Sequence, residues 1–286
     1  MLNAWFYAHK TWQIGLVVDS ALILVALVGL RVFHRLVAWR HREHDTAMVG
    51  LSYALAGGLY AVMLAFVAAA TFETMDKSEG IASEEANSLS SLIFDSGGLG
   101  SSTASKVRRE IDDYIEVVTK KEWPDQKIYR MDPRNFAEGW NILARINTDL
   151  ATFEPATDGQ ATVQLEMEHA VNDLFTSRRT RLLAARQHLP AAIWQMLIFG
   201  AGLVAIYLYL FGPYSFRIHV AVTAMTMLSI GVVMTLIIAQ DYPFRGIVSV
   251  DSESYSEVQE VAEHVFHGKA TAPHSSEQSN NPSVER

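Results

Sequence analysis

The apolar residues of this chain are concentrated in long uninterrupted stretches. Crossing a hydrocarbon core of roughly 30 Å takes about 20 helical residues. The stretches that reach this length are residues 14–33, 47–72, 191–211 and 220–239. The pattern therefore predicts an all-α membrane protein with four transmembrane helices, arranged as two membrane hairpins.

A polar region of more than a hundred residues separates the two hairpins. Its apolar residues recur at helical spacing, and Gly- and Pro-rich turn signals interrupt them. The helices expected there are residues 75–94, 103–123, 133–153 and 160–189. We therefore predict an inserted helical-bundle soluble domain, with some helices continuing directly from the membrane spans and a joint at Pro190. The predicted parts are 1–72 (hairpin), 73–190 (soluble four-helix domain), 191–239 (hairpin), 240–267 (juxtamembrane segment and short acidic helix) and 268–286 (disordered tail).

Composition narrows the function classes. Half of the residues are hydrophobic, 19% are charged and the net charge is -8, so the basic face that a nucleic acid requires is not expected. The chain has no cysteine, which excludes disulfides and thiol chemistry. A secretory signal peptide is the rival interpretation of the first span, but no small-residue cleavage site follows it, which favours a retained anchor.

The short loops indicate an orientation. Only Lys10 precedes the first span, whereas the linker after it carries Arg31, Arg35, Arg40 and Arg42. The positive-inside rule places this linker in the cytoplasm and the inserted domain outside. Four arginines before the third span oppose this assignment, although long translocated loops count little in the rule.

One acidic residue lies inside a predicted span. Asp19 is a turn and a half beyond the start of the first span, where an ionised carboxylate is costly unless it reaches water or a partner. Two interpretations remain open. Asp19 either lies in the interfacial zone or faces a pore or a partner.

Small and hydroxyl residues mark two further faces. The second span places small residues at three- or four-residue spacing, namely Gly50, Ala54, Gly58, Ala61, Ala65 and Ala68. This small face suits close helix packing or a pore lining. On the fourth span, Thr223, Thr226 and Ser229 share a sector, where hydroxyl groups either bond to their own helix or line a pore.

Two charged clusters flank the spans. Before the third span lie Arg178, Arg179, Arg181 and Arg186, which suit either an anion-concentrating vestibule or lipid headgroups. Beyond the second span lie Asp76, Glu79, Glu84 and Glu85, which suit a solvated helix face or a hard cation. The solvated face is the favoured interpretation of the acidic cluster.

No motif for catalysis or cofactor binding is present. A phosphate-binding Gly-rich loop, a GxSxG elbow and an HExxH pair are all missing from the sequence. His41 and His44 are three residues apart, but no third ligand lies nearby. We expect no enzyme activity, no cofactor and no metal.

Five blocks of sequence together resemble a known family. They are GGLYAVMLAFV at 57–67, EEANSLSSL at 84–92, YIEVVTKKEWP at 114–124, RRTRLLAARQHLPAAIW at 178–194 and AQDYPFRGIVSV at 239–250. The chain is similar to the bestrophin-like domain family of bacterial membrane proteins over nearly its whole length except the tail. It departs from true bestrophins in lacking their calcium-binding acidic run and their aromatic pore-neck pattern.

The resemblance implies a function by analogy, because bestrophins are homo-oligomeric anion channels. The hypothesis is a homo-oligomeric, ion-channel-like protein of the bacterial inner membrane, whose partners are the bilayer, further copies of itself and inorganic ions. The alternative is a membrane-anchored sensor or a structural assembly subunit. A sensor would need a cytoplasmic output module, for which the predicted orientation leaves only short loops.

Overall fold

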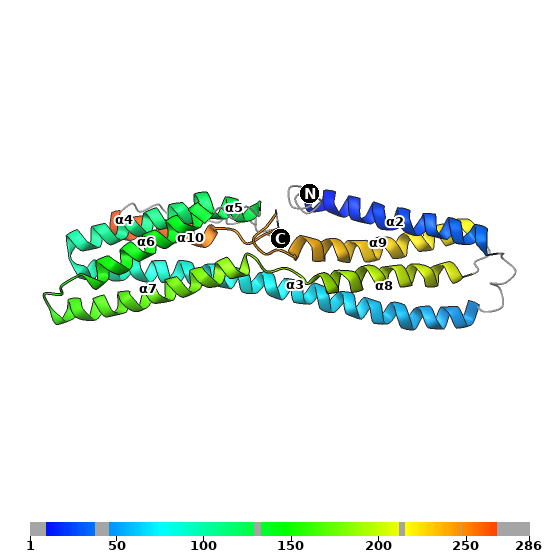
Figure 1. The fold of residues 1–286 in the computed structure, drawn as a ribbon, viewed down its shortest axis with the longest axis horizontal. Helices are drawn as coiled ribbons and strands as arrows, with labels where there is room; N and C mark the ends of the chain where they lie inside the picture. Colours follow the sequence, from blue (N-terminus) through cyan, green and yellow to red (C-terminus); the bar gives the residue numbers. More distant parts are fainter. Residues whose placement is uncertain (1–9, 38–45, 129–132, 212–214, 247, 268–286) are drawn as a thin grey trace, which may run out of the picture.

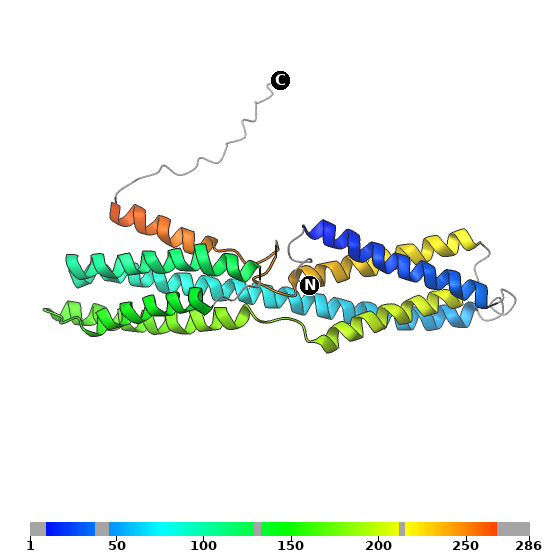
Figure 2. The ribbon, with the colours of Figure 1, turned by 45° about the horizontal axis from the view of Figure 1, so that its top comes forward.

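The computed structural model describes residues 10–37, 46–128, 133–211, 215–246 and 248–267, and it contains helices but no strands within them. His41 and His44 lie outside these ranges, as does the predicted tail. Figure 1 shows an elongated molecule, with a membrane half at one end and a helical bundle at the other. Figure 2 shows that α3 runs through both halves.

The membrane half consists of α2 (Thr11–Leu36), the first part of α3 (Thr46–Ser96), α8 (Ala191–Leu210) and α9 (Phe216–Gln240). Each helix is long and apolar enough to span a membrane. Leu64, Leu197 and Ile237 belong to the apolar core between them. The outward faces are also apolar, with Phe66 72% and Phe199 73% exposed. The prediction of four spans is confirmed.

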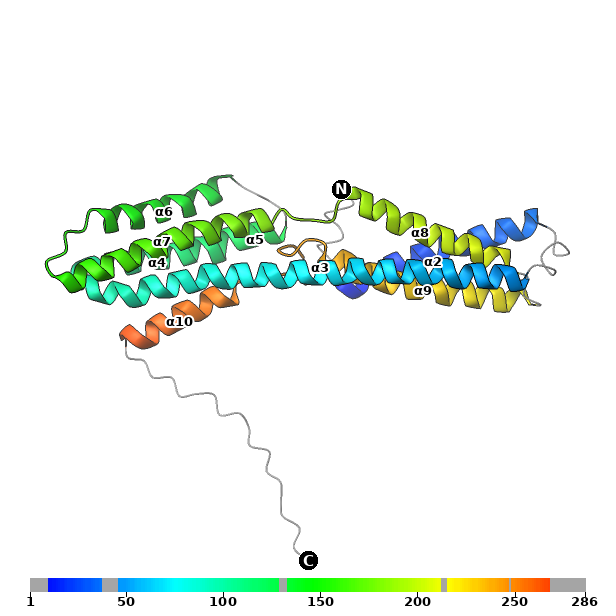
Figure 3. The same cartoon turned by 90° about the horizontal axis from the view of Figure 1, so that it is seen from below.

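The second span and the first helix of the inserted domain are one helix. α3 has 51 residues and passes from the membrane half into the bundle without a break, as Figure 3 shows. Between Phe72 and Ser96 there is no proline, and Gly80 is the one glycine. A single glycine lowers the stability of a helix by only about 1 kcal/mol relative to alanine, so the helix continues. By contrast, α7 (Asp158–Ala184) ends five residues earlier than predicted, and α8 begins directly after Pro190.

The rest of the bundle comes from the inserted segment. It contains α4 (Ser101–Val117), a π-helical turn (Val118–Glu122), α5 (Trp123–Lys127), α6 (Pro133–Ala151) and α7. α3 packs along α7, and α4 packs against α6. Fully buried Leu89, Ile111, Leu143 and Leu174 join the four long helices in one core. The helical-bundle prediction is thereby confirmed.

The segment after the last span completes this core. α10 (Glu253–His267) packs against α3. Trp123 of α5 also packs against this segment, with ring centroids 5.6 Å from Phe244 and 5.3 Å from Tyr255. Its indole N–H donates a hydrogen bond of 3.1 Å to the Val250 carbonyl. Residues 248–267 therefore pack with the bundle, although the sequence suggested a separate juxtamembrane segment.

The orientation predicted from the arginine-rich linker is open to a direct experiment in this cysteine-free chain. Single cysteines at Ser102, in the bundle, and at Ala38, in the linker, are expected to label oppositely with a membrane-impermeant thiol reagent. The positive-inside rule predicts that Ser102 is accessible from outside the cell. Labelling of Ala38 alone from outside would reverse the assignment, and equal labelling of both would refute it.

Candidate functional site

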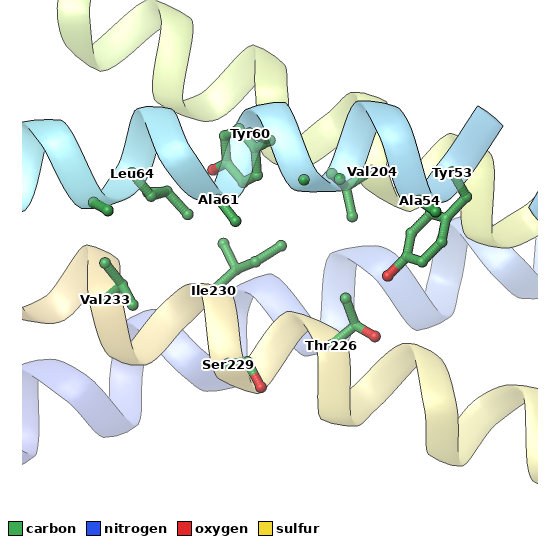
Figure 4. Close-up of a pocket in the computed structure, with 13 residues that line it drawn as sticks. Tyr53, Ala54, Tyr60, Ala61, Leu64, Val204, Thr226, Ser229, Ile230 and Val233 are labelled. Atoms are coloured by element: carbon green, nitrogen blue, oxygen red, sulfur yellow. The ribbon is translucent and has the colours of Figure 1, made fainter. Parts of the chain in front are cut away.

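A groove lies between α3 and α9 in the membrane half. It has a volume of about 410 Å³. Its lining residues are Tyr53, Ala54, Gly57, Gly58, Tyr60, Ala61, Leu64, Ala65, Val204, Thr226, Ser229, Ile230 and Val233. Figure 4 shows Ala61 of α3 and Ile230 of α9 pointing toward each other across it. Apart from the hydroxyl groups at its edges, the groove is apolar.

Most of the predicted small face borders this groove. Ala54, Gly58, Ala61 and Ala65 are all exposed and line it. A Cβ added at Gly58 would meet no atom within 4 Å, whereas one at Gly50 would come 3.7 Å from the Phe211 ring. The second span therefore does present a small face, and among the described residues no other helix covers its centre. Gly50 lies outside the groove, near the end of α8.

The hydroxyl residues of α9 divide between two environments. Thr226 and Ser229 line the groove, and each donates a 3.0 Å hydrogen bond to the carbonyl four residues earlier. Both hydroxyl groups therefore bond to their own helix, as one of the two interpretations expected, while their role in a pore stays a prediction. Thr223 is fully buried, and its hydroxyl group has no hydrogen-bond partner among the described residues. Its side chain packs inside the chain and does not line the groove.

Asp19 does not face the groove. A Cβ added at Gly231 of α9 would overlap the Asp19 Oδ1 atom, so the carboxyl group points into the contact between α2 and α9. Gly231 lies on the side of α9 opposite to Thr226 and Ser229, because residues two and five positions away on a helix point in nearly reversed directions. Of the interpretations drawn from the sequence, the carboxyl group faces a neighbouring helix and not the groove, and its place in the interfacial zone stays a prediction.

The predicted basic vestibule separates into buried and exposed residues. Arg179 and Arg186 are exposed, whereas Arg178 and Arg181 are 0% exposed. The buried pair projects into the bundle because its positions continue the apolar stripe of α7 beyond Leu174, at spacings of four and three residues. The expectation of a vestibule is therefore contradicted for Arg178 and Arg181.

The two buried arginines form an ion-pair network with two buried glutamates, which we call the charged cluster: Glu85, Glu122, Arg178 and Arg181. Arg178 Nη2 lies 2.6 Å from Glu122 Oε1, and Arg181 Nε lies 2.6 Å from Glu85 Oε2. Arg181 Nη2 also reaches Glu122 Oε2 at 2.9 Å. All four side chains are fully shielded from solvent, and their formal charges cancel.

Aromatic residues enclose the charged cluster. The Tyr114 hydroxyl group donates to Glu85, and Arg178 donates to that hydroxyl oxygen at 3.0 Å. Arg181 lies 5.0 Å from the centre of the Trp123 ring. Burial, and then the Glu85 carboxylate, raise the pKa of Tyr114 and of Tyr255 well above the ordinary value. Although burial opposes the charge of Arg181, Glu85 and Glu122 raise its pKa well above normal. The acids and arginines of the cluster are thus paired with one another.

Sequence analysis missed most of this network. Glu85 was grouped with a solvated acidic face, and Glu122 and Tyr114 were not singled out. The sequence did contain an indication of this network. Arg178 and Arg181 occupy positions of the apolar stripe of α7, and an arginine buried at such a position requires a buried acid as its partner. Within the described residues, no three His, Asp or Glu side chains come together as a metal site.

A smaller polar pocket of about 270 Å³ lies where the membrane half meets the bundle. Asp241 accepts a 2.6 Å hydrogen bond from the Leu189 backbone N–H, and Thr71 bonds to Gln240 at 3.3 Å. Burial raises the pKa of Asp241, while the Leu189 N–H and the neighbouring His188 act in the opposite direction. These contacts fasten the α7–α8 connection to the end of α9.

Comparisons with known proteins agree with this architecture. No curated protein matches the chain. A crystal structure of a variant bacterial bestrophin homologue from Klebsiella pneumoniae matches with a TM-score of 0.62 at 13% identity, covering 90% of this chain and 100% of that one. A second variant gives 0.62 at 12% identity, covering 92% and 100%. A structure described as a membrane protein gives 0.60 at 11% identity, covering 88% and 97%.

These structures share the fold of the chain, at identities too low to carry more than the fold. The match to a family model is evidence for family membership as well as for the fold. The model of the Bestrophin-like domain matches residues 20–255, which include the whole inserted segment and nearly all of the membrane half but only the start of α10. The resemblance seen in the five sequence blocks is thereby confirmed, and the chain belongs to the Bestrophin-like domain family.

Proposed function

We propose that several copies of this chain assemble in the bacterial inner membrane into an ion channel. The observation that carries the proposal is the uncovered small face of α3, which borders an apolar groove instead of a neighbouring helix. Family membership supports the same conclusion by analogy, since bestrophins conduct ions as homo-oligomers.

The described helices of a single copy enclose no route for ions. The centre of the membrane half is filled by apolar side chains, among them Leu197, Val204 and Met227, which are at most 3% exposed. The groove opens sideways along α3 and has an apolar lining. An aqueous path therefore requires a ring of copies around a common axis, with surfaces that are exposed in one chain covered by its neighbours.

The groove suits contact with a neighbouring helix. In lipid, helices associate through close packing, for which small residues clear the way. Ala54, Gly58 and Ala61 present such a surface along two helical turns. We assign the groove to the contact between copies. The adjoining exposed face of α3 then lies toward the axis or toward lipid.

Chloride is the first ion to test. The resemblance to bestrophins favours anions, and Arg179 and Arg186 remain exposed near the membrane end of the bundle, where they would concentrate anions. Purified protein in liposomes should dissipate a chloride gradient. A potassium gradient in matched liposomes measures selectivity. Assembly without flux of either ion would favour the structural-subunit alternative.

The assembly is expected to fail when the groove is filled. Gly58→Leu places a branched side chain in open space at the centre of the small face, so copies should be held apart and the oligomer should dissociate to a monomer. Native mass measurement in detergent and cross-linking in membranes would detect the change.

Gly202→Leu is the matched control for this variant. Gly202 is also an exposed glycine of a membrane helix with no atom within 4 Å of an added Cβ, but it lies on α8 and does not line the groove. Its oligomer should resemble the wild type. Equal assembly of both variants, or a monomeric wild type, would refute the proposed contact.

A further inference from the structure

The contact between α2 and α9 contains a carboxyl group that the channel proposal does not use. The two helices run antiparallel, with Gly15 opposite Thr235 and Asp19 opposite Gly231. An added Cβ at Gly15 would lie 3.3 Å from the Thr235 methyl carbon. The glycine at each level lets the polar side chain of the other helix approach the backbone directly. We call these four residues the seam: Gly15, Asp19, Gly231 and Thr235.

One carboxyl oxygen of the half-buried Asp19 and the Thr235 hydroxyl oxygen are shielded and unpaired. Asp19 Oδ1 is inaccessible to solvent and has no hydrogen-bond partner in the described part of the chain. The same holds for Thr235 Oγ1, on a residue that is 9% exposed. Counting helical rise from Thr11, Asp19 lies about 12 Å along α2, well inside the span.

No cation faces this carboxyl group from the described parts of the helices that pack on α2. The charged and titratable groups of α2, α8 and α9 with their flanks are Lys10, Asp19, Arg31, His34, Arg35, Tyr207, Tyr209, Arg217, His219 and Asp241. On α2 and α9, the others lie at least nine residues from Asp19 or Gly231, or about 13 Å. Tyr209 donates to the Ala26 carbonyl, seven residues further along α2.

The seam also has no room for a hydrated ion at Oδ1, because this atom occupies the space that a Gly231 side chain would need. A proton requires no additional volume. An ionised carboxylate without partners is strongly disfavoured in an apolar medium, and such groups become neutral instead.

From this geometry we propose that Asp19 is a proton-binding site: its carboxyl group, packed against Gly231 in the α2–α9 seam, is protonated at neutral pH. The neutral group lets α2 and α9 remain in close contact. Loss of the proton would place an uncompensated negative charge between two membrane helices, which makes this seam the place where the membrane half responds to alkaline pH. The inference does not depend on channel activity.

Infrared spectroscopy of the purified protein at neutral pH tests the proposal. A protonated carboxyl group has a carbonyl stretch that a carboxylate lacks. The difference spectrum between wild type and Asp19→Asn should contain this band. The control is Asp76→Asn, which replaces an exposed acid of α3 and should leave the band unchanged. If the wild type and Asp19→Asn have the same intensity in this region, Asp19 is ionised and the proposal is refuted.

A second measurement covers the case in which Asp19→Asn does not fold. The Asp241→Asn variant removes the buried aspartate at the end of α9. In this variant, ¹³C-labelling of aspartate should still shift a protonated carbonyl band that is shielded from hydrogen–deuterium exchange. Absence of any shielded, label-sensitive band would equally refute the proposal.

Discussion

Replacing Arg181 with alanine is expected to lower the free energy of unfolding of the bundle by about 3–5 kcal/mol, the usual effect of removing one partner from a buried ion pair. Arg181 contacts both acids of the charged cluster, at 2.6 Å from Glu85 and 2.9 Å from Glu122. Its loss would leave two buried carboxylates to share the single charge of Arg178. Denaturant unfolding in detergent, followed by circular dichroism, measures the effect.

The matched control is Arg179→Ala, two positions earlier on the same helix. Arg179 is exposed, so its replacement should change the free energy of unfolding by at most about 0.5 kcal/mol. Adding Glu85→Gln to Arg181→Ala should recover part of the loss, because one unpaired charge is removed. Similar losses for Arg181→Ala and Arg179→Ala would contradict the burial of the cluster.

A single added methyl group at Gly139 is expected to have the second-largest effect. Gly139 of α6 is buried against the charged cluster, and a Cβ there would overlap the Arg178 guanidinium group and lie 2.7 Å from Glu122 Oε1. These atoms are held by their ion pair and by a 3.0 Å hydrogen bond from Arg178 to the Phe136 carbonyl. Gly139→Ala should therefore destabilise the bundle by about 1–3 kcal/mol.

Gly80→Ala separates this crowding from the intrinsic preference of helices for alanine. Gly80 is an exposed residue of α3, and an added Cβ would meet nothing within 4 Å. The substitution should stabilise the protein by roughly 0.5–1 kcal/mol. Opposite signs for the two variants, measured by the same denaturant assay, are the expected result. Stabilisation by Gly139→Ala would show that the side chains of the charged cluster move aside at little energetic cost.

The helices were predictable because their signals are local. Twenty-residue apolar stretches determine the spans, and the absence of a breaker after Phe72 indicates that α3 continues into the bundle. The small face of α3 could likewise be read from spacing alone. What spacing cannot tell is whether another helix of the same chain covers that face, and this decides whether it packs inside one copy or between copies.

Burial of charge was the part that local patterns concealed. Arg178 and Arg179 are adjacent and chemically identical, yet one is fully buried and the other exposed. Their difference depends on Glu122, 56 residues before Arg178, and on the π-helical turn that brings Glu122 inward. Asp19 posed the same difficulty, since its environment is set by Gly231 on a helix more than two hundred residues away.

The continuity of α3 has a mechanical consequence. Its 51 residues form a rod of about 76 Å that carries Gly58 in the membrane and Glu85 in the bundle, about 40 Å apart. Glu85 of α3 forms an ion pair with Arg181 of α7. A shift of α7 would therefore also move α3, the helix that lines the groove. With one end held, each degree of tilt displaces the other by roughly 1.3 Å for a rod of this length. A small displacement of α3 within the bundle would therefore cause a larger displacement of its membrane end.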